Sequence, residues 1–123
     1  MRIWLALAAL NGFVAVAFGA AGSHILSGQL DAADLDRVRL AADYQLLHAL
    51  ALLGVTALAE RRGNLRLSLA GLCFALGVAG FSGGLYARAL AGVEVGPIVP
   101  IGGTLLLLGW FWLFAAAFGH RRQ

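Results

Sequence analysis

Hydrophobic residues along this chain form four long runs that are separated by short polar segments. The runs cover residues of about 3–22, 40–59, 67–90 and 98–118. A helix needs about 20 apolar residues to cross the hydrocarbon core of a bilayer. A transmembrane β-barrel would show alternating segments of about ten residues with turns between them. The pattern therefore predicts an all-α integral membrane bundle of four transmembrane helices, folded as a single domain over residues 1–123.

The polar segments between the runs carry signals for where helices begin. Asp31 suits the N-cap position, so the second helix is expected to start near Ala32, before the chain enters the hydrocarbon. Pro97 and Pro100 bracket the start of the fourth run, where a missing backbone N–H costs least. The first run is too long for a secretory signal, so it is interpreted as a span.

Charged residues divide unevenly between the two ends of the predicted bundle. One end carries Arg2, the segment 61–66 and the arginines of the C-terminal tail, whereas the other carries fewer arginines and most of the acidic residues. Because basic loops stay on the cytoplasmic side, we expect both termini to be cytoplasmic (N-in/C-in). Trp4, Trp110 and Trp112 fall toward the same side, as members of an interfacial aromatic belt would.

Composition agrees with this placement and excludes other classes of protein. Hydrophobic residues make up 61% of the chain and charged residues 12%, with a mean hydropathy of +0.86. A soluble domain has about 45–50% apolar and 25% charged residues. The net charge of +3 could suggest nucleic acid, but the arginines flank the apolar runs, so the expected partner is the lipid bilayer and no nucleic acid.

Glycines recur within the runs at helical spacing. Helices in lipid associate through close backbone packing, which favours small residues at their contacts. None of these glycines belongs to a GxxxxGK motif, so they are interpreted as helix-packing residues and not as a phosphate loop. The GxxxG spacing in the third run also leads us to expect a homo-oligomer. The packing candidates are Gly12, Gly19, Gly80, Gly84, Gly102 and Gly103.

Polar side chains at membrane depth are the candidate functional residues, because such groups are costly in lipid and normally face other helices or water. Three of them on the second run are spaced three or four residues apart and share one helix face. The others fall in the same outer half of the bilayer if both termini are cytoplasmic. The predicted polar cluster comprises His24, Asp43, Tyr44, Gln45, His48, Ser82 and Tyr86.

Three interpretations of this polar cluster remain open. The groups could bond one another and fix the packing, which is favoured, with each bond typically contributing about 0.6 and at most about 1.7 kcal/mol. They could bind a small molecule, an ion or a proton, with His48 as the titrating group. His24 and His48 could also be metal or haem ligands, but a third fixed ligand is missing, so neither metal nor cofactor is assigned.

The sequence does not contain the catalytic motifs that would indicate a hydrolase or a metalloprotease. No GxSxG elbow and no HExxH pair occur, and the acidic residues of the segment 31–36 are explained by helix initiation. No catalytic residue is assigned, and the protein is expected not to be an enzyme.

Four segments, taken together, resemble one family of small membrane proteins. They are Phe18–His24, Asp43–Leu50, Phe81–Tyr86 and Pro100–Gly103, followed by Gly109-Trp110. In this order they resemble domain-of-unknown-function family 423. The resemblance implies a multi-pass protein of the bacterial cytoplasmic (inner) membrane with four spans, and it brings no established activity. Ser23 before His24, where alanine is common, and Gly84, where serine is common, depart from the family pattern.

The leading functional hypothesis is a non-enzymatic membrane component whose polar cluster holds helices together and which acts through membrane-protein partners or lipid. The alternative is a small transporter or channel-like protein that uses the cluster to bind a proton, an ion or a small solute. A membrane enzyme is a third and less favoured class, because the sequence locates no substrate pocket.

Overall fold

The computed structural model describes residues 2–61 and 63–119, and within them it is built of helices. Its elements are α1 (Arg2–His24), the short 3-10 helix η1 (Leu26–Gly28), α2 (Ala32–Arg61), α3 (Leu65–Ala91) and α4 (Ile98–Ala116). The four α-helices are long and apolar enough to cross a membrane. The prediction of an all-α bundle with four spans is confirmed.

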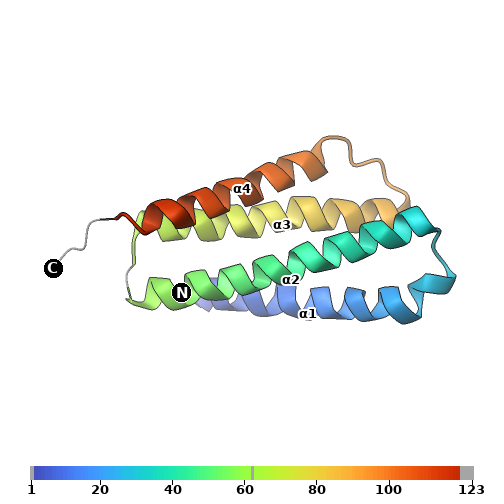
Figure 1. Ribbon diagram of the computed structural model, residues 1–123, viewed down its shortest axis with the longest axis horizontal. Coiled ribbons are helices and arrows are strands. Elements are labelled where there is room, and N and C mark those ends of the chain that lie inside the picture. Colours follow the sequence, from blue (N-terminus) through green and yellow to red (C-terminus); the bar gives the residue numbers. More distant parts are fainter. Residues whose placement is uncertain (1, 62, 120–123) are drawn as a thin grey trace.

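The helices lie side by side and alternate in direction (Figure 1). The connections 25–31 and 92–97 both lie at one end of the bundle, which we call the loop end. The start of α1, the end of α2, the start of α3 and the end of α4 lie at the other end, which we call the terminal end. Which of the two ends faces the cytoplasm stays a prediction from the arginine count.

Local capping sets the helix boundaries. The carboxylate of Asp31 accepts a hydrogen bond from the backbone N–H of Asp34 at 2.8 Å, and α2 begins at Ala32 as predicted. Gly92 closes α3 with a φ of 65°, a left-handed conformation that glycine adopts without strain. The fourth helix ends at Ala116, two residues before the predicted limit, because the chain turns there.

Successive helices pack on one another, α1 on α2, α2 on α3 and α3 on α4. The main core lies between them and is centred on Phe74 and Leu52, both fully buried. Many large apolar side chains point outward instead, and Phe13 and Leu107 are 75% and 73% exposed. In water such a surface would drive aggregation, whereas in a bilayer it contacts lipid.

Glycines allow the backbones of α3 and α4 to approach each other closely. A Cβ on Gly102 would collide with the backbone of Phe81 and would lie 2.8 Å from the carbonyl oxygen of Gly77. A Cβ on Gly84 would lie 2.7 Å from a methyl group of Val99. The two backbones can therefore approach only where side chains are absent.

The other predicted packing glycines differ in their surroundings. Gly80 lies against Gly102, Gly12 is in ordinary contact with Ala49, and Gly103 faces the Phe81 ring at 3.6 Å. Apart from the backbone of its own helix, no atom of the described residues lies within 4 Å of a Cβ on Gly19. Gly80 and Gly84 are therefore used for packing inside one chain, so they no longer support the expectation of a homo-oligomer.

Candidate functional site

A buried chain of hydrogen bonds joins α1, α2 and α3 through the amide of Gln45. Its Nε2 donates to Oδ1 of Asn11 at 3.0 Å, and its Oε1 accepts from the hydroxyl of Tyr86 at 2.7 Å. Asn11 donates in turn to the carbonyl oxygen of Leu7 at 2.8 Å. The Phe18 ring stacks on the Tyr86 ring with centroids 4.2 Å apart. The amide is thus engaged on both sides and shielded from lipid.

Ser82 supplies a second link between α2 and α3. It is 1% exposed, and its hydroxyl donates to the carbonyl oxygen of Ala41 at 2.8 Å. No buried side-chain nitrogen or oxygen in the described part of the chain lacks a hydrogen-bond partner. Asn11, Gln45, Ser82 and Tyr86 thus each have a hydrogen-bond partner inside the bundle, and we call this set the closed network. Interhelical hydrogen bonds of this kind hold a bundle together in lipid.

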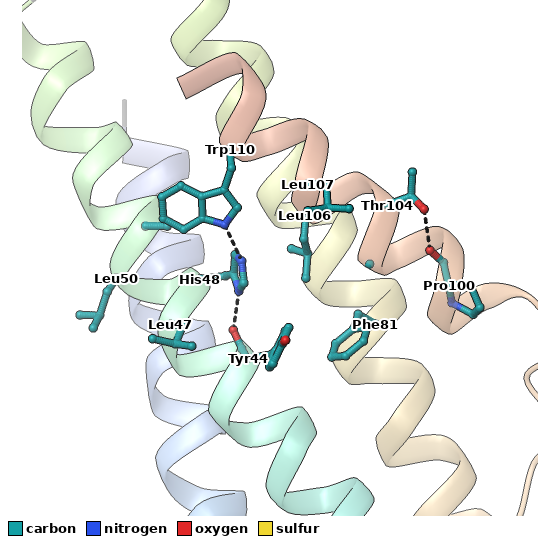
Figure 2. Close-up of a pocket in the computed structure, with 12 residues that line it drawn as sticks. Tyr44, Leu47, His48, Leu50, Phe81, Pro100, Thr104, Leu106, Leu107 and Trp110 are labelled. Carbon is teal, nitrogen blue, oxygen red and sulfur yellow. Dashed lines mark hydrogen bonds between the residues drawn. The ribbon is translucent and has the colours of Figure 1, made fainter. Parts of the chain in front are cut away.

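His48 links α2 to α4, and its two partners define its protonation. Nδ1 lies 2.7 Å from the carbonyl oxygen of Tyr44, which can only accept a hydrogen bond, so Nδ1 carries the hydrogen. The indole N–H of Trp110 donates to Nε2 at 3.1 Å, so Nε2 is the unprotonated acceptor. Figure 2 shows His48 between these two partners. The imidazole is neutral in this arrangement, and both of its nitrogens are engaged.

A groove with a volume of about 870 Å³ lies between α2 and α4, beside His48 (Figure 2). Phe81 of α3 lies between the two helices, and its ring approaches the Tyr44 ring with centroids 4.8 Å apart. Leu47 and Leu107, which also line the groove, are 56% and 73% exposed, so the groove opens sideways toward the bilayer. Pockets that hold small ligands have volumes of about 300–1,000 Å³, and this one falls within that range.

Polar groups in the groove are few. The Tyr44 hydroxyl makes no hydrogen bond within residues 2–61 and 63–119, and the Tyr44 side chain is 39% exposed. The hydroxyl of Thr104 donates to the carbonyl oxygen of Pro100 at 2.9 Å, and its oxygen can still accept. The groove therefore offers one hydroxyl that can donate and one that can accept, set among apolar walls.

The structure divides the predicted polar cluster into separate places. Gln45, Ser82 and Tyr86 belong to the closed network, whereas Tyr44 and His48 line the groove. His24 and Asp43 belong to neither. Both are exposed, and His24 ends α1 at the loop end.

His24 and His48 are far apart along the bundle. His48 lies sixteen residues into α2, which corresponds to about 24 Å along the helix axis from the loop end. The described residues hold no group of three or more His, Cys, Asp and Glu side chains that could bind a metal ion. The arrangement gives the metal or haem interpretation no converging pair of ligands.

Two residues important to this region were missed at the sequence level. Asn11 bonds Gln45, although it was not assigned to the polar cluster. Trp110 was expected in an interfacial aromatic belt, but it lies against Phe74 of the core at a centroid distance of 5.0 Å and bonds His48. The residue is also 47% exposed, so it lies at the edge of the bundle, and its membership of an aromatic belt stays a prediction. The polarity of Asn11 in an otherwise apolar run was a usable signal, whereas Trp110 gave none.

The comparisons with known proteins agree with the sequence pattern. The family described as "Protein of unknown function (DUF423)" matches residues 18–103. The UPF0382 inner membrane protein YgdD of Escherichia coli strain K12 is 35% identical over 123 residues, covering 99% of this chain and 94% of that protein. No solved structure matches.

Relatives from other bacteria show the same extent of similarity. A UPF0382 membrane protein of Haemophilus influenzae is 41% identical, covering 94% of this chain and 93% of its own. The UPF0382 membrane protein SAB0533 of Staphylococcus aureus is 37% identical, and the match covers 96% of this chain and 97% of that protein. With its four spans, the chain is a multi-pass protein of the bacterial cytoplasmic membrane. It belongs to the family of proteins of unknown function DUF423, as the resemblance of its motifs predicted.

Proposed function

We propose that this chain is a non-enzymatic membrane protein that binds an amphiphilic molecule dissolved in the bilayer, and that it does so in the groove between α2 and α4. One observation carries the proposal. An aromatic-lined groove with an unpaired Tyr44 hydroxyl opens toward lipid, while the polar network beside it is closed. The network serves as interhelical support, and the groove serves as the binding surface.

The shape and chemistry of the groove suit an amphiphile better than an aqueous solute. Exposed leucines form its rim, so a ligand enters from the bilayer and keeps a hydrocarbon portion against Leu47 and Leu107. The polar portion accepts a hydrogen bond from Tyr44 and lies against aromatic rings. The closed network offers no row of unpaired groups along which a hydrated ion could pass.

We also propose that the groove carries out no reaction on the molecule that it binds. His48 is the imidazole that lines the groove, and its two nitrogens are held by the carbonyl oxygen of Tyr44 and the indole of Trp110. A general base needs a free nitrogen within hydrogen-bond reach of the proton that it removes. Bound molecules are therefore expected to be released chemically unchanged.

A groove-filling substitution tests the binding. Ala51 lines the groove, so Ala51→Phe fills it, whereas Ala57→Phe places the same ring on an exposed part of the same helix outside the groove. With 9,10-dibromostearate as the probe, quenching of Trp110 fluorescence in a Trp4→Phe, Trp112→Phe background reports occupancy. We expect Ala51→Phe to weaken binding at least tenfold and Ala57→Phe to leave it unchanged. Equal quenching in both variants would refute the groove as the binding site.

The hydroxyl of Tyr44 gives a finer test of the same site. Tyr44→Phe keeps the ring and removes the donor, and a neutral hydrogen bond contributes about 0.5–1.5 kcal/mol, or roughly two- to twelvefold in affinity. A separate measurement tests whether a reaction takes place. After incubation with the protein, the recovered 9,10-dibromostearate should have an unaltered mass. A chemically changed probe would point to a membrane enzyme.

Transport of a proton, an ion or a small solute is the alternative, because an ionisable residue at membrane depth, His48, faces the groove. It predicts that His48→Leu abolishes proton or solute flux in proteoliposomes while the protein stays folded. Under the binding proposal, wild-type proteoliposomes carry no flux above that of protein-free liposomes.

A further inference from the structure

A second cavity lies at the terminal end of the bundle, between the end of α2, the start of α3 and the end of α4. Its volume is about 460 Å³, and it shares no lining residue with the groove. The apolar side is formed by Leu58, Leu67 and Leu113, and the polar side by Arg61 and Asn64. The cavity is therefore amphipathic, with hydrocarbon on one side and hydrogen-bond donors on the other.

Arg66 does not line the cavity, but its guanidinium lies near the same point as the amide of Asn64, which does. Oδ1 of Asn64 caps α3 by accepting from the N–H of Leu67 at 2.8 Å, which leaves the amide nitrogen as a donor. Arg66 donates one of its five N–H groups to the carbonyl oxygen of Ala115 at 2.8 Å. The same Nη1 atom of Arg66 and the Nδ2 atom of Asn64 lie 3.8 and 3.9 Å from the position of a Cβ on Gly119, and the carbonyl oxygen of Ala116 lies 3.4 Å from it.

Charge at this end is positive and uncompensated by ion pairs. The two ion pairs within the described residues, Arg37–Asp34 and Arg88–Glu94, both lie toward the loop end. Arg61 and Arg66 take part in neither, and Glu60 is the acidic residue nearest to them in sequence. The site therefore combines guanidinium groups with a carboxamide donor beside a leucine wall, of which Leu58 is exposed and Leu113 is half-buried.

We propose that this terminal cavity binds one anionic phospholipid, with its phosphate on Arg61, Asn64 and Arg66 and an acyl chain along Leu58 and Leu113. Guanidinium groups bind phosphate oxygens through paired N–H donors. The cavity lies where helices end, at the depth of the lipid headgroups, and basic pockets between transmembrane helices bind such headgroups. The leucine wall favours a lipid over free phosphate, which would leave that wall without a partner. This inference stands independently of the groove and its ligand.

The test compares two lipids with identical acyl chains, phosphatidylglycerol and phosphatidylcholine, by native mass spectrometry of the full chain released from nanodiscs. Arg61→Gln removes one guanidinium, and Asn64→Ser keeps a helix-capping oxygen while removing the amide donor. Arg39→Gln is the matched control, because Arg39 is exposed and lies toward the loop end. Circular dichroism and thermal unfolding verify that each variant is folded.

We expect Arg61→Gln to weaken phosphatidylglycerol binding about fivefold, the effect of one arginine at a membrane surface. Asn64→Ser should weaken it less, and Arg39→Gln should leave it unchanged. Phosphatidylcholine binding should be weak in every variant. Equal retention of the two lipids by the wild type, or an equal loss in Arg39→Gln, would overturn the proposal. Release of the lipid by millimolar inorganic phosphate, with phosphate retained in its place, would also overturn it in favour of a phosphate site.

Discussion

The indole N–H of Trp110 donates to Nε2 of His48 across 3.1 Å and thereby joins α4 to α2. Because Nδ1 of the same ring is held by the carbonyl oxygen of Tyr44, one contact on each side fixes the orientation of the imidazole. Both rings line the groove, so this bond also shapes the wall against which a ligand would lie. A residue expected at the membrane surface is thus part of the candidate site.

The protonation of His48 can be observed directly. Solid-state NMR of the protein labelled with ¹⁵N at histidine should show a neutral ring with the hydrogen on Nδ1 and a bare Nε2, because the two partners require that arrangement. Assignment follows from the loss of this signal in His48→Gln. Trp110→Phe retains an aromatic ring against Phe74 but removes the indole N–H. It should therefore change the ¹⁵N chemical shift of Nε2 of His48, which loses its hydrogen-bond donor. A hydrogen found on Nε2 in the wild type would contradict the geometry.

The Gln45–Tyr86 hydrogen bond should stabilise the bundle by a measurable amount. Tyr86→Phe removes one hydroxyl, and Gln45→Leu removes the amide that accepts from it and donates to Asn11. A double-mutant cycle on the free energy of unfolding in bicelles should give a coupling of about 0.6–1.7 kcal/mol. Gln45→Leu alone should cost more than Tyr86→Phe, because it also leaves Oδ1 of Asn11 without its donor. A coupling of zero would mean that the two side chains are not bonded in the membrane.

Two adjacent glycines of α4 should respond differently to the same methyl group. Gly102→Ala drives a Cβ into the backbone of Phe81, whereas Gly103→Ala places it in ordinary contact with the Phe81 ring. We expect Gly102→Ala to destabilise the protein by about 1–3 kcal/mol through overpacking of α3 against α4. Thermal unfolding in detergent compares the two variants. Equal melting temperatures would show that α4 does not approach α3 this closely.

The predicted orientation can be tested with single cysteines. In a Cys73→Ser background, Gln29→Cys places a thiol in the exposed connection at the loop end, and Gly63→Cys places one at the terminal end. If both termini are cytoplasmic, a membrane-impermeant maleimide added to spheroplasts labels only the Gln29→Cys variant. Permeabilised membranes, in which both thiols should react, provide the control. Labelling of Gly63→Cys alone would reverse the orientation.

The terminal end would then be cytoplasmic, and the anionic lipid proposed for its cavity would come from the inner leaflet. Arg61 and Arg66 would contribute both to the orientation of the chain and to the binding of that lipid. The two roles are separable, because Arg61→Gln leaves the other arginines of this end in place to preserve the orientation. The cysteine-labelling pattern of Arg61→Gln should match that of the parent protein.

The sequence by itself determined the four spans, because crossing a bilayer depends on the length and apolar character of each run, and both are local properties. Local chemistry also placed the start of α2, since an N-cap needs only the side chain of Asp31 and the N–H groups of the next turn. The prediction that Gln45, Ser82 and Tyr86 share one half of the bilayer followed from the alternating direction of the spans and from helical rise.

Only the tertiary structure decided which side chains meet. A helix that is apolar all round carries little information about the face that it turns inward. Neither the pairing of Asn11 with Gln45 nor that of Trp110 with His48 could therefore be read from spacing. The same rotation directs Gly80 and Gly84 into α4 and leaves Gly19 without a close neighbour. Helix rotation in lipid is set by packing with neighbouring helices, and that packing created the groove and the terminal cavity.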